Sequence, residues 1–484
     1  MIYQQLYNKA KRKDPVKFAL IGAGSFGSDV IGQSLRHPLL RASAAVDLRI
    51  DLARKAYTVC GVSEDDIVFC DSPAKALAAM EANKYIITDD AMVLMELPID
   101  AIVEGTGIPE AGAFFGYNAI KNGKHFIMVN KEADSVVAPI LKYEADRAGV
   151  VYTAAEGDQP GLILGMLSWA SNLSFDVLCA GKFRDLEIGF NNYTKEFDFG
   201  LAGGPKFGHP HYPGDEWRPP VLRDEDRWAL ELMEPGRELE FLQKRYEIMS
   251  KGNHTGVLNF DICELVVVAN ASNLIPDTPT THTPFVRMNE VAHVLCLEED
   301  GGLLKNKGVI DAVTPIRDSI GMSAGGGVFI VVDCGQDYSG RALAGNTMTN
   351  KNGTATVFVR PHHMTGLETP TSILVAGILG VPTGGDVVKP RYDMVRRPYE
   401  DLKAGYEIYC GTEHVYNMEA LILPAQMKSP DAPIPWHLAD GCKLKCDVPA
   451  GTIITYDMVE EPKDNFLWNL RKRQDELFLK QGDL

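Results

Sequence analysis

Long apolar runs are missing from the 484-residue sequence, and none reaches the roughly 18 residues that a transmembrane helix needs. The first residues, MIYQQLYNKAKRKDPVKF, are basic but do not lead into the apolar stretch of a signal peptide. We therefore expect a cytoplasmic protein with no membrane partner.

Basic residues are also in the minority. The chain has 48 Lys and Arg against 65 Asp and Glu, which gives a net charge of -17. An acidic surface repels phosphate backbones, so we expect no nucleic-acid partner. A small anionic metabolite is still allowed, because a local cluster of Lys and Arg outweighs a distant average charge.

Cysteine is sparse, with nine residues in the whole chain, and this odd, low number argues against a disulfide framework. Cys442 and Cys446 form a close pair, but no second Cys/His pair lies nearby at zinc spacing. We expect reduced and mostly buried thiols rather than a structural zinc site.

Short apolar strands alternate with helical segments through the first third of the chain. The length predicts two or three domains. The alternation predicts an α/β fold whose first domain, residues 1–155, is a doubly wound parallel sheet with helices on both faces. Its strands are predicted at 16–22, 41–48, 66–70, 101–104, 125–129 and 150–153.

The pattern changes after Glu156. Strands and helices in mixed order predict an α+β domain over 156–385, which carries the substrate site. An apolar helix at 258–273 is expected to cross a buried interface. The last helix of this domain is expected at 366–379, before a Gly/Pro-rich loop.

A small C-terminal β module is expected over 386–484. The evidence is an internal repeat, in which Asp401-Leu-Lys-Ala-Gly405 recurs as Asp447-Val-Pro-Ala-Gly451. Each copy is predicted to form a turn followed by a strand. The final helix, at 463–480, is rich in charge and is expected to lie on the surface.

A glycine-rich turn, Gly22-Ala-Gly24-Ser-Phe-Gly27, follows the first predicted strand and opens a helix. The first glycine permits the tight turn, the second lets the backbone approach a pyrophosphate, and the third lets helix and strand pack closely. The helix N-terminus adds free N–H groups and a positive dipole. We predict a Rossmann domain that binds NADP or NAD through Gly22, Gly24, Ser25, Phe26 and Gly27.

Asp47 ends the second predicted strand, where an acidic residue binds the ribose hydroxyls of the cofactor. Its carboxylate favours NAD, whereas Arg49 favours the 2′-phosphate of NADP, so both cofactors stay open. The turn Gly105-Thr106-Gly107 follows a central strand and forms either a wall for the nicotinamide ribose or an ordinary loop. Asn130 ends the next strand and completes the predicted cofactor site.

Four residues are candidates for catalysis. Lys131 ends a buried strand, where it can polarise a carbonyl or protonate an alkoxide, unless it is only a surface lysine. Lys182 follows another strand and is assigned similar chemistry. Glu156 and Asp158 lie two residues apart in a Gly/Pro turn and either bind substrate or a divalent metal, or only cap the next helix.

Four further residues are candidates for substrate binding. Arg184 lies two residues from Lys182, and Arg317 with the glycine-rich loop that begins at Ser323 is a candidate anion nest. His363, after Arg360-Pro-His362, either reaches the cleft or packs as an ordinary histidine.

A polar insertion at about 192–222 contains His209 and His211. These two histidines are either metal ligands or solvated loop residues. The identity of any metal is left open.

Together the segments GAGSFG, VNKE, EGDQPG and RPHHMTGLETP and the repeat-bearing tail resemble the homoserine-dehydrogenase-like NAD(P)-dependent oxidoreductases that carry a C-terminal SAF domain. The resemblance covers nearly the whole chain. It implies that Lys131 lines the substrate site, that Lys182 loosely matches a catalytic-domain lysine, and that the segment after residue 360 returns to the Rossmann domain. It also implies that the middle domain forms a homodimer or a higher homo-oligomer.

Within this family the resemblance points to type II 1-deoxy-D-xylulose 5-phosphate reductoisomerase-like enzymes of isoprenoid biosynthesis, which form 2-C-methyl-D-erythritol 4-phosphate with NADPH. The acidic amino-acid-binding segment of homoserine dehydrogenases is not found, which argues against homoserine. Two alternatives stay open: a dehydrogenase of an unphosphorylated sugar acid, polyol or aldehyde, and a non-enzymatic carbohydrate-binding protein. The leading prediction is an NAD(P)H-dependent oxidoreductase that reduces a small carbonyl substrate.

Overall fold

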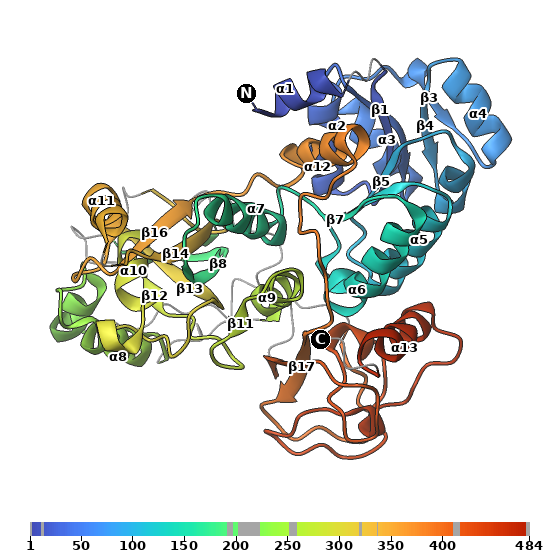
Figure 1. The fold of residues 1–484 in the computed structure, drawn as a ribbon. Coiled ribbons are helices and arrows are strands. Elements are labelled where there is room, and N and C mark those ends of the chain that lie inside the picture. The colour runs from blue at the N-terminus through green and yellow to red at the C-terminus, as the bar shows by residue number, and fades with distance from the viewer. Residues whose placement is uncertain are drawn as a thin grey trace.

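The computed structural model describes residues 2–10, 14–190, 197–201, 223–250, 259–318, 322–335, 337–409 and 417–480. It has three lobes, each built around one sheet (Figure 1). The predicted α/β fold class is confirmed, with a Rossmann-type parallel sheet, a mixed sheet and a small antiparallel sheet. His209 and His211, in the predicted insertion, lie outside the described residues.

The first lobe contains a seven-stranded parallel sheet in the order β3-β4-β2-β1-β5-β6-β7. Its central strand β1 (Val16–Ile21) is buried except at Lys17, as expected for a strand that helices cover on both faces. The other strands are β2 (Leu40–Val46), β3 (Ile67–Phe69), β4 (Tyr85–Thr88), β5 (Ala101–Glu104), β6 (His125–Met128) and β7 (Tyr152–Ala154). The helices around the sheet are α2 (Ser25–Ser34), α3 (Ile50–Thr58), α4 (Pro73–Glu81), α5 (Pro109–Lys121) and α6 (Lys131–Ala148).

The second lobe contains a mixed nine-stranded sheet, in which seven strands follow the order β10-β9-β13-β8-β14-β16-β15 while β11 and β12 pair with β13. Two helices, α7 (Gln159–Asn172) and α9 (Asn259–Ala271), lie between this sheet and the other lobes (Figure 1). The far side carries α8 (Glu238–Ser250), α10 (Val291–Val294) and α11 (Tyr338–Asn346). The strands are β8 (Val177–Phe183), β9 (Leu186–Phe190), β10 (Phe197–Leu201), β11 (Ile275–Pro276), β12 (Phe285–Val286), β13 (Val309–Asp318), β14 (Val328–Asp333), β15 (Met348–Thr349) and β16 (Ala355–Arg360).

After β16 the chain returns to the first sheet. A 3-10 turn, α12 (Pro370–Leu374) and a π-helical turn (Val375–Leu379) replace the single helix predicted at 366–379. The segment packs on α2 and β1. Two of its residues at this contact are glycines, which have no side chain. A Cβ on Gly366 would lie 2.2 Å from the carbonyl oxygen of Phe26, and one on Gly377 would lie 2.5 Å from Val16. Close backbone contact therefore holds this segment against the glycine-rich turn.

The third lobe contains the antiparallel pair β17 (Tyr392–Pro398) and β18 (Met418–Pro424). The repeat forms turns that pair with each other, rather than the turn-plus-strand units that were predicted. Leu402 and Val448 exchange both backbone hydrogen bonds at 2.9 Å. The N–H of Ala404 donates to Asp447 and that of Ala450 donates to Asp401, again both at 2.9 Å. The two copies are thus related by a local pseudo-twofold axis.

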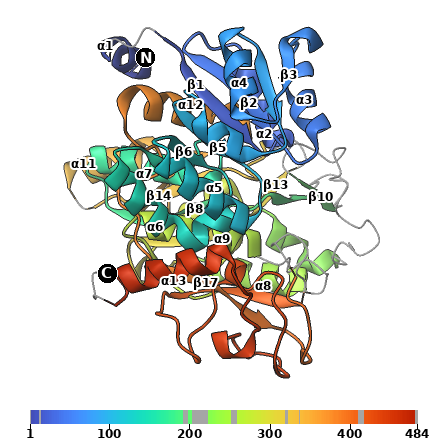
Figure 2. The same cartoon turned by 90° about the vertical axis from the view of Figure 1, so that its right-hand side faces the viewer.

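The last helix, α13 (Phe466–Phe478), corrects the prediction of a surface helix at 463–480. It packs against α5 and α6 of the first lobe (Figure 2). Its buried apolar side chains include Leu467, Trp468 and Leu470. Charge misled the prediction because Arg471 is buried with partners, Asp393 at 2.6 Å and Asp475 at 2.7 Å.

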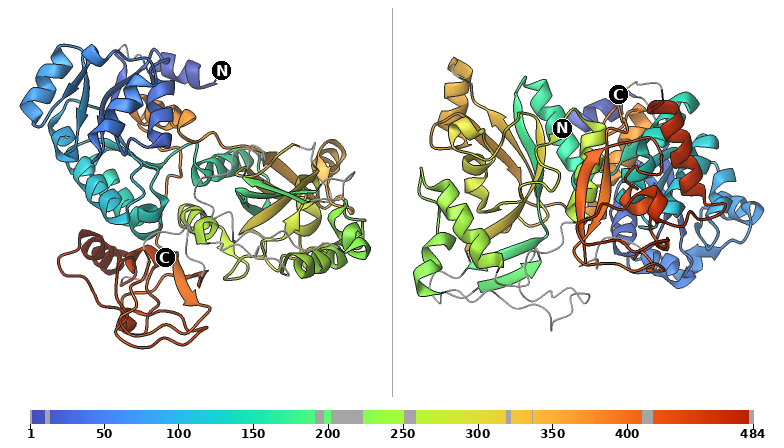
Figure 3. Two further views of the ribbon diagram at one scale, coloured as in Figure 1. Left: turned by 180° about the vertical axis from the view of Figure 1, so that it is seen from behind. Right: turned by 90° about the horizontal axis from the view of Figure 1, so that it is seen from below.

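The third lobe therefore contacts both other lobes, since α13 packs on α6 while β17 and β18 pack on α9 (Figure 3).

Among the helices of the described residues, none is both long and apolar enough to cross a bilayer.

Replacing Gly366 by alanine is expected to lower the free energy of unfolding by about 1–3 kcal/mol, the usual cost of overpacking. The added methyl group would have only 2.2 Å to the carbonyl oxygen of Phe26. Gly345→Ala in α11 is the matched control, because its methyl group meets nothing within 4 Å and alanine favours a helix by up to about 1 kcal/mol. Chemical denaturation of both variants measures the difference, and equal stabilities would contradict the packing described.

Candidate functional site

Four loops meet at the carboxyl edge of the first sheet, because β1, β5, β6 and β7 are parallel neighbours. They are the glycine-rich turn after β1 and the loops at 105–107, 130–131 and 156–158. The chain changes direction across the sheet between β1 and β5, and ligands of open α/β sheets bind outside such a point. The predicted cofactor and catalytic residues of these loops thus share one edge.

The three glycines of the turn have the surroundings that their predicted roles require. Gly22 has a φ of +92°, and a Cβ there would lie 2.7 Å from the backbone of the loop after β5. A Cβ on Gly27 would lie 2.4 Å from the carbonyl oxygen of Gly22. Nothing lies within 4 Å of the missing side chain of Gly24. Ser25 and Phe26 follow in the first turn of α2, whose free N–H groups suit a phosphate.

Asp47 lies directly after β2 and is hydrogen-bonded to the glycine-rich turn. One carboxylate oxygen accepts a hydrogen bond from the N–H of Ala23 at 3.0 Å, and the other accepts from the N–H of Arg49 at 2.9 Å. A carboxylate has about four acceptor sites, so Asp47 can still bind ribose hydroxyls. Arg49 immediately precedes α3 at the same edge, and both cofactor forms therefore stay open.

The loop after β5 is held by Asn130. The side-chain amide of Asn130 donates to Thr106 Oγ1 at 3.3 Å and to the carbonyl of Ile108 at 2.9 Å, while its oxygen caps α6 by accepting from Ala133 at 3.1 Å. The fully buried Glu104 accepts from the N–H of Thr106 at 2.9 Å, and burial raises the pKa of Glu104 to about 7. Gly105, Thr106 and Gly107 are thus held beside the glycine-rich turn by Glu104, the last residue of β5, and by Asn130, the N-cap of α6.

A cluster of paired charges lies where α6, α9 and β8 meet. Glu264 on α9 contacts both predicted lysines: its Oε1 lies 3.0 Å from Lys131 Nζ, and its Oε2 contacts Lys182 Nζ. Lys182 also lies 3.0 Å from Asp261, which in turn pairs with Arg184 at 2.9 Å. The side chains of Lys182 and Glu264 are 0% exposed, whereas that of Lys131 is 13% exposed. Lys131 is therefore the lysine that a ligand can reach.

The electrostatics of this cluster follow from burial and pairing. Burial alone lowers the pKa of both lysines, but the neighbouring carboxylates outweigh it and raise the pKa of Lys131 and Lys182 well above the ordinary lysine value. Burial raises the pKa of Glu264 to about 7, although the two ammonium groups oppose that rise. Asp261 is also buried, yet Lys182 and Arg184 lower its pKa.

Glu156 and Asp158 face different charged neighbours. Asp158 caps α7 by accepting from the N–H of Gln159 at 3.1 Å, and its carboxylate lies 4.0 Å from Lys131 Nζ. Burial raises the pKa of Glu156, and Arg360 is the cation that opposes this rise. Asp158 thus belongs to the lysine cluster.

Within the described part of the chain, no group of three or more His, Cys, Asp or Glu side chains is placed to hold a metal ion.

His363 lies at the rim of the cluster. A Cβ on Gly326 would lie 2.7 Å from the ring of His363 and 2.6 Å from Asp185, so these groups surround one point. Asp185 in turn lies 3.9 Å from Lys182 Nζ. Of the predicted substrate residues, Arg184 and His363 are therefore close to the lysines.

Arg317 and Ser323 lie elsewhere in the second lobe. Ala312 on β13 pairs with Lys182, and Arg317 is five residues further along that strand, about 16 Å away. A carboxylate of the chain itself already occupies the predicted anion nest. Glu187 accepts from Arg317 at 2.7 Å and from the N–H of Ala324, next to Ser323, at 3.0 Å.

Asp261 and Glu264 are functional candidates that the sequence analysis missed. The helix predicted at 258–273 was expected only to be apolar and to cross a buried interface. The available signal was two carboxylates three residues apart, which share one helix face. A helix that is otherwise buried must pair such charges, and the partners are Lys131, Lys182 and Arg184.

Residues 260–369 match the family model described as Oxidoreductase DRL, catalytic domain, and this range contains Asp261 and Glu264. The matched range covers 110 of the 484 residues, and its description agrees with the predicted oxidoreductase class. No curated protein matches the chain.

Several solved structures resemble part of the chain, with low sequence identity and low TM-scores. One is a point mutant of KijD10, a 3-ketoreductase from Actinomadura kijaniata in complex with TDP-benzene and NADP, with 16% identity over 37% of this chain, 49% of the other chain and a TM-score of 0.23. Another is a dehydrogenase from Chromobacterium violaceum, with 18% identity over 37% of this chain, 46% of the other and a TM-score of 0.25. The chain therefore spans just under half the length of each.

Gly24→Ala is expected to weaken NAD(P)H binding by about tenfold or more while leaving stability within about 0.5 kcal/mol, because its methyl group points into the open space for the pyrophosphate. Gly27→Ala is the matched variant and is expected to lower stability instead, because its methyl group has 2.4 Å to the Gly22 carbonyl oxygen. Calorimetric titration with NADPH and NADH, together with thermal melting, separates the two. Unchanged affinity in Gly24→Ala would contradict the cofactor site.

Glu104→Gln is expected to flatten the dependence of stability on pH. The pKa of Glu104 is raised from 4.5 to about 7, so its contribution to stability is present below pH 4.5 and is lost as the pH rises through about 7. Glutamine cannot ionise, so the variant should gain about 3 kcal/mol relative to the wild type between these limits. Urea denaturation across this range checks the shift, with Glu96→Gln, an exposed residue, as the control.

Proposed function

We propose that the chain is an NAD(P)H-dependent oxidoreductase that reduces a small carbonyl substrate. The observation that carries the proposal is the placement of Lys131. This lysine shares one sheet edge with the glycine-rich turn and is also paired with Glu264 from the second lobe at 3.0 Å. A substrate between the two lobes would thus meet the nicotinamide on one side and a charged proton donor on the other.

The bound cofactor supplies the hydride that forms the new C–H bond of the product. Lys131 accounts for the other half of the reduction, because its ammonium group stabilises the negative charge that develops on the carbonyl oxygen and then donates a proton to it. Glu264 holds Lys131 in place through Oε1 and is itself anchored through Oε2 by the buried Lys182. Lys182 therefore acts on the carboxylate rather than on the substrate.

The finer proposal from the family resemblance is a reductoisomerase that acts on 1-deoxy-D-xylulose 5-phosphate with NADPH, within a homodimer whose domains divide near residues 155 and 385 and whose tail is SAF-like. Such a substrate needs cations for its phosphate. Arg184 is bonded to Asp261 at 2.9 Å, and Arg317 to Glu187 at 2.7 Å. This internal pairing favours a second candidate, a dehydrogenase of an unphosphorylated sugar acid, polyol or aldehyde.

The two candidates differ in whether the substrate carries a phosphate group. Purified protein is incubated with 1-deoxyxylulose 5-phosphate or with its unphosphorylated form, each with NADPH and with NADH, and the absorbance of the reduced cofactor is followed. Oxidation that depends on the phosphorylated sugar supports the reductoisomerase, and oxidation with a neutral hydroxy-carbonyl supports the second candidate. Failure of a broad carbonyl panel with both cofactors would reject the reductase itself.

Lys131→Met is expected to lower kcat by about 100-fold or more while leaving the Kd for NAD(P)H unchanged, because the variant loses the proton donor but keeps the glycine-rich turn. Lys142→Met on the same helix is the matched control. Lys142 pairs with Asp146 at 2.6 Å and takes no part in the cluster. Steady-state kinetics and calorimetric titration of both variants test the assignment, and similar kcat values for the two would remove Lys131 from the reaction.

A further inference from the structure

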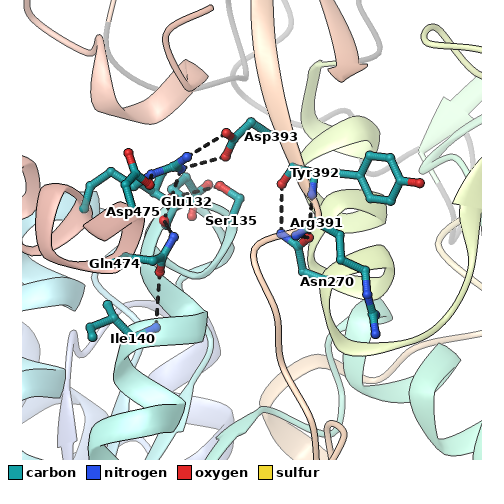
Figure 4. A network of polar contacts seen from close by, with 11 residues as sticks. Glu132, Ser135, Ile140, Asn270, Arg391, Tyr392, Asp393, Gln474 and Asp475 are labelled. Carbon is teal, nitrogen blue, oxygen red and sulfur yellow. Dashed lines mark hydrogen bonds and ion pairs between the residues drawn. The ribbon is translucent and has the colours of Figure 1, made fainter. Parts of the chain in front are cut away.

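A chain of buried polar contacts crosses the third lobe and joins α6 to α9, the two helices that supply Lys131 and Glu264 (Figure 4). We call it the polar bridge, and it consists of Gln474 and Arg471 on α13, Asp393 on β17 and Asn270 on α9. Gln474, Arg471, Asp393 and Asn270 are each at most 5% exposed.

The α6 end of the polar bridge lies beside a proline inside the helix. Pro139 sits inside α6, where it removes one backbone donor and crowds the preceding turn. Next to it, the side-chain amide of Gln474 accepts from the N–H of Ile140 at 3.1 Å and donates to the carbonyl of Val136 at 3.0 Å. These are the two groups that an uninterrupted helix would pair with each other. One side chain of α13 therefore bridges this turn of α6.

The middle of the polar bridge is a two-pronged ion pair. Arg471 binds both carboxylate oxygens of Asp393, at 2.6 and 2.7 Å, and its Nε binds Asp475 at 2.7 Å. A guanidinium fork on a carboxylate fixes orientation as well as distance. Replacing such a buried pair by apolar side chains is often neutral or stabilising. Fold stability alone therefore does not account for it.

The α9 end of the polar bridge is Asn270, in the last turn of the helix. Its amide donates to the carbonyl of Tyr392 at 3.0 Å and accepts from the N–H groups of Arg391 and Tyr392 at 3.0 and 2.9 Å. Tyr392 is the residue before Asp393, so α9 is tied to the same strand that holds Arg471.

Lys131 and Glu264 meet at another place along these two helices. Lys131 is the first residue of α6, and Glu264 lies six residues before Asn270 on α9. The backbone carbonyl of Lys131 also accepts from Cys263 Sγ at 3.3 Å, so the helices touch at this point. Any shift of α6 against α9 therefore changes the distance between the ammonium and carboxylate groups directly.

We propose that Gln474 and Asn270 are positioning residues of the reaction, which act through the polar bridge to set the spacing of α6 and α9 and hence the Lys131–Glu264 pair. The proposal rests on the proposed function, because it assigns the pair a part in turnover. In a buried pair the interaction energy depends steeply on separation, and a misplacement of about 1 Å costs a reaction up to about 100-fold.

The test uses the full chain and two variants that keep side-chain size, Gln474→Met and Asn270→Leu. We expect each to lower kcat by about tenfold or more, while KM and the Kd for NAD(P)H stay within about twofold. Asn270→Asp keeps the acceptor oxygen for the N–H groups of Arg391 and Tyr392 but loses the donor to the Tyr392 carbonyl, so it should restore kcat only in part. Gln474→Met, which acts at the α6 end, keeps the test independent of any folding defect in the Asn270 variants.

Arg473→Met is the matched control on α13. Arg473 also joins α13 to α6, through Glu144, but it lies outside the polar bridge and is 43% exposed. It should leave kcat unchanged even where it lowers the melting temperature. An equal loss of kcat in Arg473→Met, or full kcat in a folded Gln474→Met, would overturn the proposal.

A second readout needs no substrate. The labelling rate of individual lysines by an amine-reactive probe is followed by mass spectrometry, and Lys131 should react several-fold faster in Gln474→Met while Lys142, on the same helix, keeps its rate. Equal acceleration at both would indicate loosening of the whole helix and would refute the assigned role. If the wild type reduces no carbonyl, the proposed function fails, whereas the labelling result still decides whether the polar bridge positions Lys131.

Discussion

The contact of Glu264 with two lysines is the interaction on which the rest of the site depends. Two lysines and one carboxylate are largely removed from water there, and each charge is tolerable only with an opposite partner within hydrogen-bonding distance. Lys182 and Glu264 are 0% exposed, so neither has solvent as an alternative partner. The positions of α6, α9 and β8 are therefore coupled, because moving any one of them leaves a buried charge without its partner.

This constraint explains how the lobes cooperate. The first lobe supplies Lys131 at the same sheet edge as the glycine-rich turn, and the second lobe supplies Lys182 and Glu264. The segment after β16 returns to pack on α2, and the third lobe touches both α6 and α9. The functional residues thus lie at the seam where the lobes meet rather than inside any one of them.

Sequence patterns were sufficient for the parts of the fold that depend on near neighbours. Six of the seven parallel strands and the glycine-rich turn are local signals that the sequence predicted, whereas β4 (Tyr85–Thr88) was missed. Patterns were insufficient where charge is paired over long distances. Arg317 and the loop at Ser323 were predicted to bind an external anion. The carboxylate that they bind instead, Glu187, comes from another strand, so the local sequence does not reveal it. The helix α13 read as a surface helix because Asp393, the partner of Arg471, lies far away in the chain.

By itself the sequence determined the Rossmann-type sheet, the position of the glycine-rich turn and the placement of Lys131 at a strand's carboxyl end, since periodicity and the conformational freedom of glycine act within a few residues. The tertiary structure alone decided which charges meet. Lys131, Lys182 and Glu264 belong to three separate segments, and no local rule relates them. They meet because burial penalises an unpaired charge, and the packing of these three elements removes that penalty for all of them.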